Sequence, residues 1–152
     1  MPHEDPLTAM LSDDRMELTL RLANKDALLA ELARRAAGLT GVSETLLRKA
    51  LVTRETLGST GFGAGIAVPH ARVDGLDEPF CFFVRLDKPI SFDAIDGKPV
   101  DLVFLLLTPS AQNSAHLTLL ATIAKRLRRK SVADALRHAN GPAQVRQSLL
   151  EF

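Results

Sequence analysis

The sequence predicts a single α/β domain, and three observations support that prediction. Segments with strand alternation and segments with helical periodicity follow one another along the chain, which is typical of a sheet packed by helices. The chain has 152 residues, of which 46% are hydrophobic and 24% charged, so one domain with a substantial core is expected. We find no internal repeat, low-complexity block or linker, and therefore assign residues 1–152 to one domain.

The first part of the chain predicts a tail, a strand and a helix. Residues 1–8 are polar and contain prolines, which indicates a flexible tail. Apolar and polar residues alternate over 16–22, as expected of a strand with one buried face. Asn24 is a good N-cap for a helix through Ala37, and Gly38 can end that helix.

A second helix follows and leads to a glycine-rich loop. Ser43 is its predicted N-cap, and the helix is expected to end near Arg54 and Glu55. Helical spacing predicts that four apolar residues face inward: Leu46, Leu47, Ala50 and Leu51. Four glycines then occur within eight residues: Gly58, Gly61, Gly63 and Gly65. This density indicates positive φ angles or close approach of the backbone to a ligand.

A short strand and a histidine come directly after the glycines. Ile66–Val68 is an apolar run that predicts a strand ending at Pro69, because proline cannot donate to a sheet ladder. His70 is therefore expected just past the strand, where a partner can reach it.

The middle of the chain predicts two central strands. Phe80–Leu86 is almost continuously apolar, and Val100–Thr108 contains the most apolar stretch of the sequence. Residues 87–89 are expected to turn the chain after the first strand, and Asp96-Gly97 is a strong turn signal. Pro109 is expected to end the second strand.

The last part predicts three helices. The first is expected over Ala115–Lys130 with Asn113 or Ser114 as its cap. Its predicted buried stripe consists of Leu117, Leu120, Ala121, Ala124 and Leu127, with His116 at one margin. A sequence resembling a capping box starts at Ser131, and Pro142 occupies the favoured first position of a final helix to residue 150.

Composition and charge exclude several classes of protein. The net charge of +1 argues against a dedicated nucleic-acid binder. The single cysteine, Cys81, lies among apolar residues, so we expect a buried structural thiol. The N-terminus does not resemble a secretory signal, and no apolar run approaches the roughly 20 residues that span a bilayer. A cytoplasmic protein without membrane insertion is therefore expected.

Two of the four histidines, His70 and His116, are candidates for chemistry. A neutral imidazole is a nucleophile at cellular pH, so it can accept a phosphoryl group if donors hold the phosphoryl oxygens. The chain offers Arg54 as a cation and the backbone of Gly61–Gly65 as a possible anion cradle. Because a histidine at a helix end is often structural, the residues alone leave the role of His116 open.

Residues 55–71 resemble the active-site signature of a known family. The pattern E-x6-FG-x2-IAVPHA is similar to that of the fructose/mannitol-type enzyme IIA domains of the bacterial phosphotransferase system. Phe92–Phe104 and His116-Leu117 also resemble that family, especially its nitrogen-regulatory branch. The resemblance covers about residues 8–150, with two departures at Ala64 and Ala71, where the family often has asparagine and glycine.

The resemblance implies a mixed central sheet with helices on both faces and phosphorylation of His70 on Nε2. It maps the catalytic arginine and second histidine of the family onto Arg54 and His116. Our predicted phosphoryl-binding loop consists of Ser59, Thr60, Gly61, Gly63 and Gly65, although the two hydroxyl residues are equally interpretable as turn residues. A structural role is predicted for Glu55, because a carboxylate would repel a phosphoryl group.

The implied function is that of a phosphocarrier, a phosphotransferase component that needs no cofactor or metal. It would accept a phosphoryl group on His70 from an HPr-like protein and regulate target proteins by its phosphorylation state. One alternative is a sugar-transport IIA that passes the group to a separate IIB protein. The others are a binding module whose histidine never reacts and a metal-dependent hydrolase using His70 and His116. The basic run Lys125–Lys130 fits a solvated helix end or a docking surface for an acidic partner.

Overall fold

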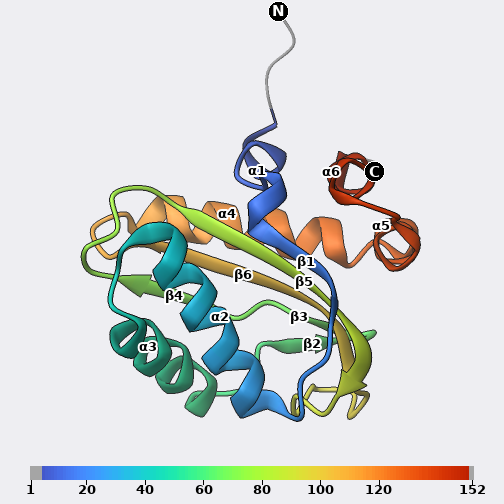
Figure 1. The fold of residues 1–152 in the computed structure, drawn as a ribbon, viewed down its shortest axis with the longest axis horizontal. Helices are drawn as coiled ribbons and strands as arrows, with labels where there is room; N and C mark the ends of the chain where they lie inside the picture. Colours follow the sequence, from blue (N-terminus) through green and yellow to red (C-terminus); the bar gives the residue numbers. More distant parts are fainter. Residues whose placement is uncertain (1–4, 151–152) are drawn as a thin grey trace, which may run out of the picture.

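Two long antiparallel strands, β5 (Phe80–Ile90) and β6 (Val100–Pro109), form the centre of the sheet. The structure is a computed structural model that describes residues 5–150 (Figure 1). β1 (Met16–Leu20) pairs with β5 in parallel at one edge and ends two residues earlier than predicted. Because parallel and antiparallel pairs occur together, the sheet is mixed, as predicted.

The other side of β6 carries an edge that is interrupted by a proline. β3 (Ile66–Ala67) and β4 (His70–Val73) both run parallel to β6, and β2 (Gly61–Gly63) pairs with β3. The predictions that the strand stops before Pro69 and that His70 lies just past it are confirmed, but His70 also begins a further strand, which was not predicted. The Pro69 carbonyl accepts from the Leu106 N–H, so the chain stays beside β6 and re-enters the sheet at His70.

Helices cover both faces of the sheet, as the fold prediction required (Figure 1). α2 and α3 lie on one face, and α1, α4, α5 and α6 lie on the other. Their bounds, with those of the short 3₁₀ helix η1, are α1 (Pro6–Ala9), η1 (Asp13–Arg15), α2 (Lys25–Thr40), α3 (Glu44–Thr56), α4 (Asn113–Leu127), α5 (Lys130–His138) and α6 (Pro142–Leu150).

Alternate residues of β5 belong to two separate apolar clusters. Phe80 and Phe82 pack toward α2 and α3, whereas Cys81 and Phe83 pack toward the helices of the opposite face. The continuous apolar run of this strand therefore reflects burial on both sides. Burial also raises the pKa of the Cys81 thiol to about 12, which confirms a structural thiol.

Part of the predicted tail is folded. Asp5 caps α1 through the Thr8 N–H, and Leu7 is fully buried against the α4–α6 face. Asp5 also forms a bidentate ion pair with Arg126 of α4. The flexible tail predicted for residues 1–8 is thus wrong for residues 5–8, and residues 1–4, with His3, lie outside the described residues.

Two predicted chain breaks do not occur. Gly38 lies inside α2, which continues until Gly41 adopts a left-handed conformation (φ 79°). β5 continues through residues 87–89 to Ile90, because an irregularity in its pairing with β6 after Arg85 accommodates Pro89. The predicted turn at Asp96-Gly97 is confirmed by a hydrogen bond from the Gly97 N–H to the Ala94 carbonyl.

Three details of the helices differ from the prediction. Gln112 and Arg129 precede α4 and α5 without side-chain caps, so the cap predictions at residues 113–114 and 131 are wrong. The buried face of α4 is rotated toward His116 and Ile123, and Leu117 is 65% exposed. Leu46 of α3 is also largely exposed. The predicted stripe is confirmed at Leu127, which is buried, and at Leu120, which packs against the core, but it is wrong at Leu117.

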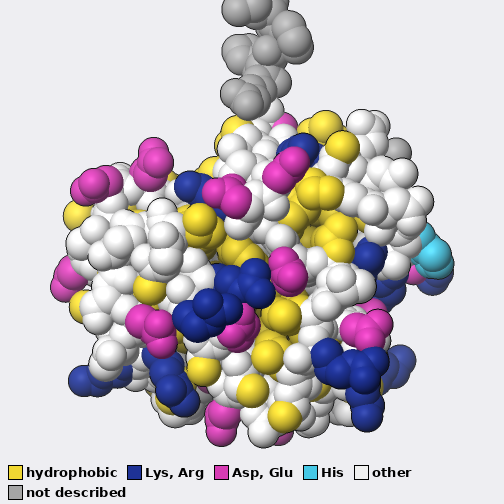
Figure 2. All heavy atoms as spheres, in the orientation of Figure 1, with side chains coloured by type: hydrophobic (Ala, Val, Ile, Leu, Met, Phe, Trp, Pro, Cys, Tyr) yellow, Lys and Arg dark blue, Asp and Glu magenta, His cyan; other side chains and the backbone are white. Residues whose placement is uncertain are grey.

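The surface carries both signs of charge. On the face seen in Figure 2, basic side chains lie interspersed with acidic ones. This distribution is in keeping with the net charge of +1.

Candidate functional site

The structure brings Arg54, His70 and His116 together. Arg54 lies in the last turn of α3, His70 begins β4, and His116 lies in the first turn of α4. The two imidazole rings are 5.5 Å apart between centroids, and Arg54 Nε lies 3.2 Å from His70 Nε2. All three residues line an open groove of about 1120 Å³, whose rim includes the exposed side chains of Leu57 and Leu117.

The hydrogen bonds of His70 fix its tautomer. Nδ1 lies 2.8 Å from the Val68 carbonyl, which can only accept, so Nδ1 carries the proton. Nε2 is therefore unprotonated, and its lone pair accepts the Arg54 Nε–H. The half-buried ring thus presents Nε2 to the groove as its nucleophilic atom.

Arg54 is held at a second point. Its terminal nitrogen NH1 donates to the Gly58 carbonyl at 2.9 Å, while Nε donates to His70. The position at the C-terminal end of α3 also suits a cation, because the helix dipole is negative there. The guanidinium is consequently fixed beside the nucleophilic nitrogen.

His116 is anchored to the end of β6. Its side chain is only 7% exposed, and Nδ1 lies 2.6 Å from the hydroxyl oxygen of the fully buried Thr108. If the hydroxyl donates to Nδ1, the proton of the neutral ring resides on Nε2 and can be donated to a ligand.

Both imidazoles are favoured in their neutral form. Burial lowers the pKa of His70, and the nearby Arg54 charge lowers it further. Burial also lowers the pKa of His116, assisted by His70 and Arg72. At neutral pH both rings are therefore uncharged, and His70 is available as a nucleophile.

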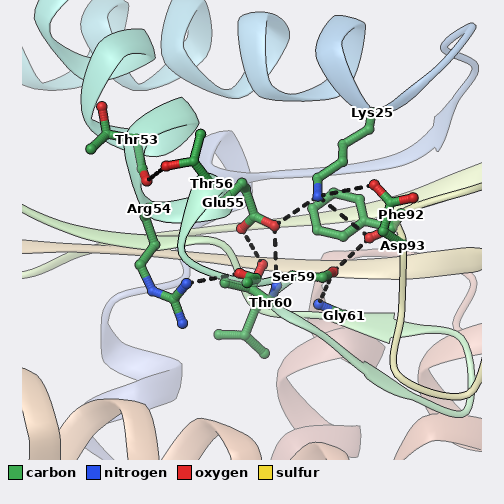
Figure 3. A network of polar contacts seen from close by, with 12 residues as sticks. Lys25, Thr53, Arg54, Glu55, Thr56, Ser59, Thr60, Gly61, Phe92 and Asp93 are labelled. Carbon is green, nitrogen blue, oxygen red and sulfur yellow. Dashed lines mark hydrogen bonds and ion pairs between the residues drawn. The ribbon is translucent and has the colours of Figure 1, made fainter.

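Glu55 holds the turn that follows α3, which confirms its predicted structural role (Figure 3). Its carboxylate accepts the Thr60 N–H at 3.1 Å and the Thr60 hydroxyl at 2.5 Å. Lys25 of α2 pairs with the same carboxylate at 3.0 Å. The side chain of Glu55 is only 6% exposed and points toward Lys25 and Thr60, and Glu55 is absent from the groove lining.

The predicted phosphoryl-binding loop engages the protein itself. The Ser59 hydroxyl donates to the Phe92 carbonyl, and the Gly61 N–H donates to the Ser59 hydroxyl oxygen. A Cβ on Gly61 would lie 3.0 Å from that of Ala94, and one on Gly65 would lie 2.6 Å from the Arg137 guanidinium. Tight packing thus accounts for Gly61, and packing together with a φ of 80° accounts for Gly65. The predicted positive φ angles are confirmed at Gly58, Gly63 and Gly65. The groove lining contains none of the predicted loop residues Ser59, Thr60, Gly61, Gly63 and Gly65, which counts against a cradle there.

Sequence analysis missed two residues that support the site. Thr108 is a polar residue at the end of an apolar run, and that position was the available signal. Lys25 is distant in sequence from Glu55, so only the folded chain reveals their contact. Within residues 5–150, no group of three or more His, Cys, Asp or Glu side chains could hold a metal ion, and no helix there could cross a membrane.

Comparisons with known proteins show the family of the chain. Residues 9–152 match the model of the family described as phosphoenolpyruvate-dependent sugar phosphotransferase system, EIIA 2. A nitrogen regulatory protein of Bradyrhizobium diazoefficiens is 43% identical over 145 residues, covering 95% of this chain and 94% of the relative.

Solved structures agree as well. The nitrogen regulatory protein IIA-Ntr of Neisseria meningitidis superposes with a TM-score of 0.91 at 32% identity, covering 95% of this chain and 99% of that one. The mannitol IIA of Escherichia coli has the same fold, with a TM-score of 0.77 at 22% identity, covering 91% of this chain and 98% of that one. The chain therefore belongs to the EIIA 2 family of the phosphoenolpyruvate-dependent sugar phosphotransferase system.

Proposed function

We propose that this chain is a phosphocarrier that accepts a phosphoryl group on Nε2 of His70 from an HPr-like phosphohistidine protein. The supporting observation is a pair of hydrogen bonds at the groove: Val68 holds Nδ1–H, and Arg54 donates to the unprotonated Nε2. Membership in the EIIA 2 family supports phosphotransfer as the reaction class.

The reaction is a direct exchange of one P–N bond for another. The Nε2 lone pair of His70 attacks phosphorus, and the bond between phosphorus and the donor imidazole breaks with its electron pair returning to the donor. The donor ring carries a proton on its other nitrogen and leaves as a neutral imidazole, whereas His70 keeps Nδ1–H on the Val68 carbonyl and becomes a phosphoimidazolium, so charge and protons balance. The Arg54 Nε–H leaves Nε2 and donates to a phosphoryl oxygen instead. We assign a second donor to Nε2–H of His116, with Thr108 holding the opposite ring nitrogen.

The output of the proposed reaction is a change of charge in the groove. A phosphoryl group with about −1.5 to −2 charge replaces a neutral ring surface, so target proteins can distinguish the two states. The relatives named nitrogen regulatory protein favour regulation of such targets as the role of this chain.

Intact-mass measurement after incubation with phosphoenolpyruvate, enzyme I and an HPr-type carrier tests the proposal. The wild type should gain one acid-labile phosphoryl group, and His70→Ala should gain none. The exposed His138→Ala is the matched control and should behave as wild type. A phosphoryl gain by His70→Ala, or none by wild type with any carrier, would contradict it. Transfer onward to a IIB cysteine would favour the sugar-transport alternative.

A further inference from the structure

We propose that Lys25, Glu55 and Thr60 are positioning residues for phosphoryl transfer. They fix the turn at residues 57–60, whose Gly58 carbonyl holds Arg54 against His70. This inference rests on the proposed function, because it explains how the arginine is kept in place for the reaction. None of the three side chains touches the reacting atoms.

The carboxylate of Glu55 is buried and fully engaged. Both oxygens of Glu55 are occupied. Oε1 accepts from the Thr60 N–H and forms an ion pair with Lys25, and Oε2 accepts from the Thr60 hydroxyl. The side chain is 6% exposed and that of Lys25 is 18% exposed. An ion pair at this depth is costly to break, so it holds one geometry better than a surface pair does.

The charges of Lys25 and Glu55 lie at helix ends that disfavour them. Lys25 is the first residue of α2, where the helix dipole disfavours a cation, and Glu55 lies in the last turn of α3, where it disfavours an anion. Each charge is therefore poorly placed by itself and is neutralised by the other. Secondary structure alone gives no reason for this arrangement. A link between the two helix ends does, and we call the linked side chains of Lys25, Glu55 and Thr60 the clamp.

The clamp is connected to Arg54 through the turn at residues 57–60. The turn begins at the end of α3, where the Leu57 and Gly58 N–H groups donate to the carbonyls of Arg54 and Glu55. It ends at Thr60, which Glu55 holds by two hydrogen bonds. Gly58 lies between these fixed points, and its carbonyl accepts the Arg54 guanidinium at 2.9 Å.

A second attachment holds the same turn from the side of β5 (Figure 3). The Ser59 hydroxyl donates to the Phe92 carbonyl, and Lys25 lies over the Phe92 ring at 4.5 Å from its centroid. Asp93 lies 3.6 Å from the same ammonium. Lys25 thus joins the turn, α2 and the segment after β5 into one cluster.

The clamp also removes an electrostatic obstacle. Glu55 is adjacent in sequence to Arg54, and its negative charge would oppose the approach of a phosphoryl group. Pairing with Lys25 offsets that charge where it lies. The network therefore both fixes the arginine and shields the acceptor from a buried carboxylate.

The test compares phosphoryl uptake in variants that cut the clamp without touching the groove. Thr60→Val removes the hydroxyl and keeps the shape, whereas Thr60→Ser keeps the hydroxyl. Lys25→Met removes the ammonium and keeps the stem. We expect Thr60→Val and Lys25→Met to lower the transfer rate at saturating HPr-type donor about tenfold, because Arg54 is misplaced. The donor concentration that gives half the maximal rate should be unchanged. Thr60→Ser should transfer at the wild-type rate.

A spectroscopic readout separates positioning from stability. In the wild type, the Arg54 Nε–H proton should be protected from exchange with water and should show coupling to His70 Nε2 by NMR. Thr60→Val and Lys25→Met should lose both features. Glu31→Gln, which cuts an α2 ion pair with Arg34 and Arg35 away from the groove, is the matched control and should keep both features and the rate.

Two outcomes would overturn the inference. Folded Thr60→Val and Lys25→Met proteins that transfer at the wild-type rate and retain the Arg54 signal would show that the clamp is purely structural. Slow transfer by Glu31→Gln would show a general effect of stability. If the wild type accepts no phosphoryl group, the proposed function fails, and the Arg54 signal in the variants still decides whether the clamp positions the arginine.

Discussion

The chemistry of the site depends on a single lone pair, that of His70 Nε2. Val68 holds the opposite ring nitrogen in its protonated form, and Arg54 donates to the free one. Burial and the charge of Arg54 both lower the pKa of His70, so in the proposed reaction the residue that assists transfer also keeps the nucleophile neutral.

Replacing Arg54 should therefore change both titration and rate. Arg54→Ala should raise the pKa of His70 toward its ordinary value without reaching it, because burial still opposes the charged ring. Phosphoryl uptake should fall about 10²-fold or more, as expected when one charged donor is lost. NMR titration of the ring gives the pKa, and intact mass against time gives the rate.

Arg72→Ala is the matched control for this titration. Arg72 lowers the pKa of His116, so this change should raise that of His116 and leave His70 nearly unchanged. An unchanged or lower pKa of His70 in Arg54→Ala would contradict the assigned role of the arginine.

Ala64 provides a second test at the residue scale. It has a φ of 56° at the tip of the β2–β3 hairpin, in the left-handed region that alanine adopts at a cost. Ala64→Gly should stabilise the protein by about 0.5–1 kcal/mol, the excess of that cost over the extra freedom of glycine in the unfolded chain. Urea unfolding would show a higher midpoint with an unchanged slope.

The control for Ala64 has the opposite sign. Ala37→Gly lies inside α2 and should destabilise by about 1 kcal/mol. A lower midpoint for Ala64→Gly would mean that the hairpin does not retain the positive φ.

At the scale of elements, sequence patterns located strands and helices better than their ends. The apolar runs in β5 and β6 predicted central strands because both faces are buried. The return of the chain to the sheet at His70 was not predictable, since it depends on a hydrogen bond from the Leu106 N–H to the Pro69 carbonyl. Pro89 suggested a turn, but an irregularity in strand pairing accommodates it.

The candidate site, like the fold, could be predicted only in part from the sequence. His70, Arg54 and His116 could be found from a short motif and its resemblance to a family. The glycine cluster predicted positive φ angles, which Gly58, Gly63 and Gly65 adopt, but ligand approach and tight packing select the same residue, and only the structure shows Gly65 against Arg137. Lys25 could not be found at all, since its contact with Glu55 exists only in the folded chain.

Arg85 joins three elements and offers a test at this scale. Its guanidinium donates to the Leu18 carbonyl of β1 and to carbonyls at the C-terminal end of α5, including those of Leu136 and Ala139. Carbonyls at a helix end have no partner within the helix. Arg85→Met should remove this donor, leaving the Leu136 carbonyl only the long bond from the Ala139 N–H at 3.4 Å, and should cost about 2 kcal/mol in the free energy of unfolding, measured with urea.

The same variant should leave phosphoryl uptake unchanged below its unfolding transition, since Arg85 lies outside the groove. Arg34→Met, which removes an exposed ion pair of α2, should have little effect on stability. Equal stability of the two variants would show that the α5 carbonyls are solvated and that Arg85 does not fix that helix.

At the scale of the whole molecule, the site and the core both depend on burial. The sheet is buried on both faces, and the edge of β4 and the start of α4 meet where the two histidines are partly or fully withdrawn from water. Burial keeps these rings neutral, so folding and reactivity both favour the unprotonated state. Stability should therefore depend on pH through the residues of the proposed reaction.

The sign of this dependence follows from the lowered pKa values of both rings. An unfolded histidine titrates near 6.5, so between that value and the lower folded values the unfolded chain binds more protons. The histidine contribution should be fully present above about pH 6.5 and should be lost as pH falls through the folded pKa values, by at most about 1.4 kcal/mol per pH unit for each ring. Urea unfolding from pH 7.5 to 5 measures it.

A His70→Gln/His116→Gln double variant should lose most of the pH dependence of stability in this range. It should keep the loss of stability at lower pH, where Asp5 and Glu31 become protonated. The pKa values of these two carboxyl groups are lowered by hydrogen bonds from Arg126 and Arg34. A wild-type protein equally stable at pH 5 and 7.5 would mean that the rings gain charge in the folded state as easily as in the unfolded one, and that burial does not hold His70 ready as a nucleophile.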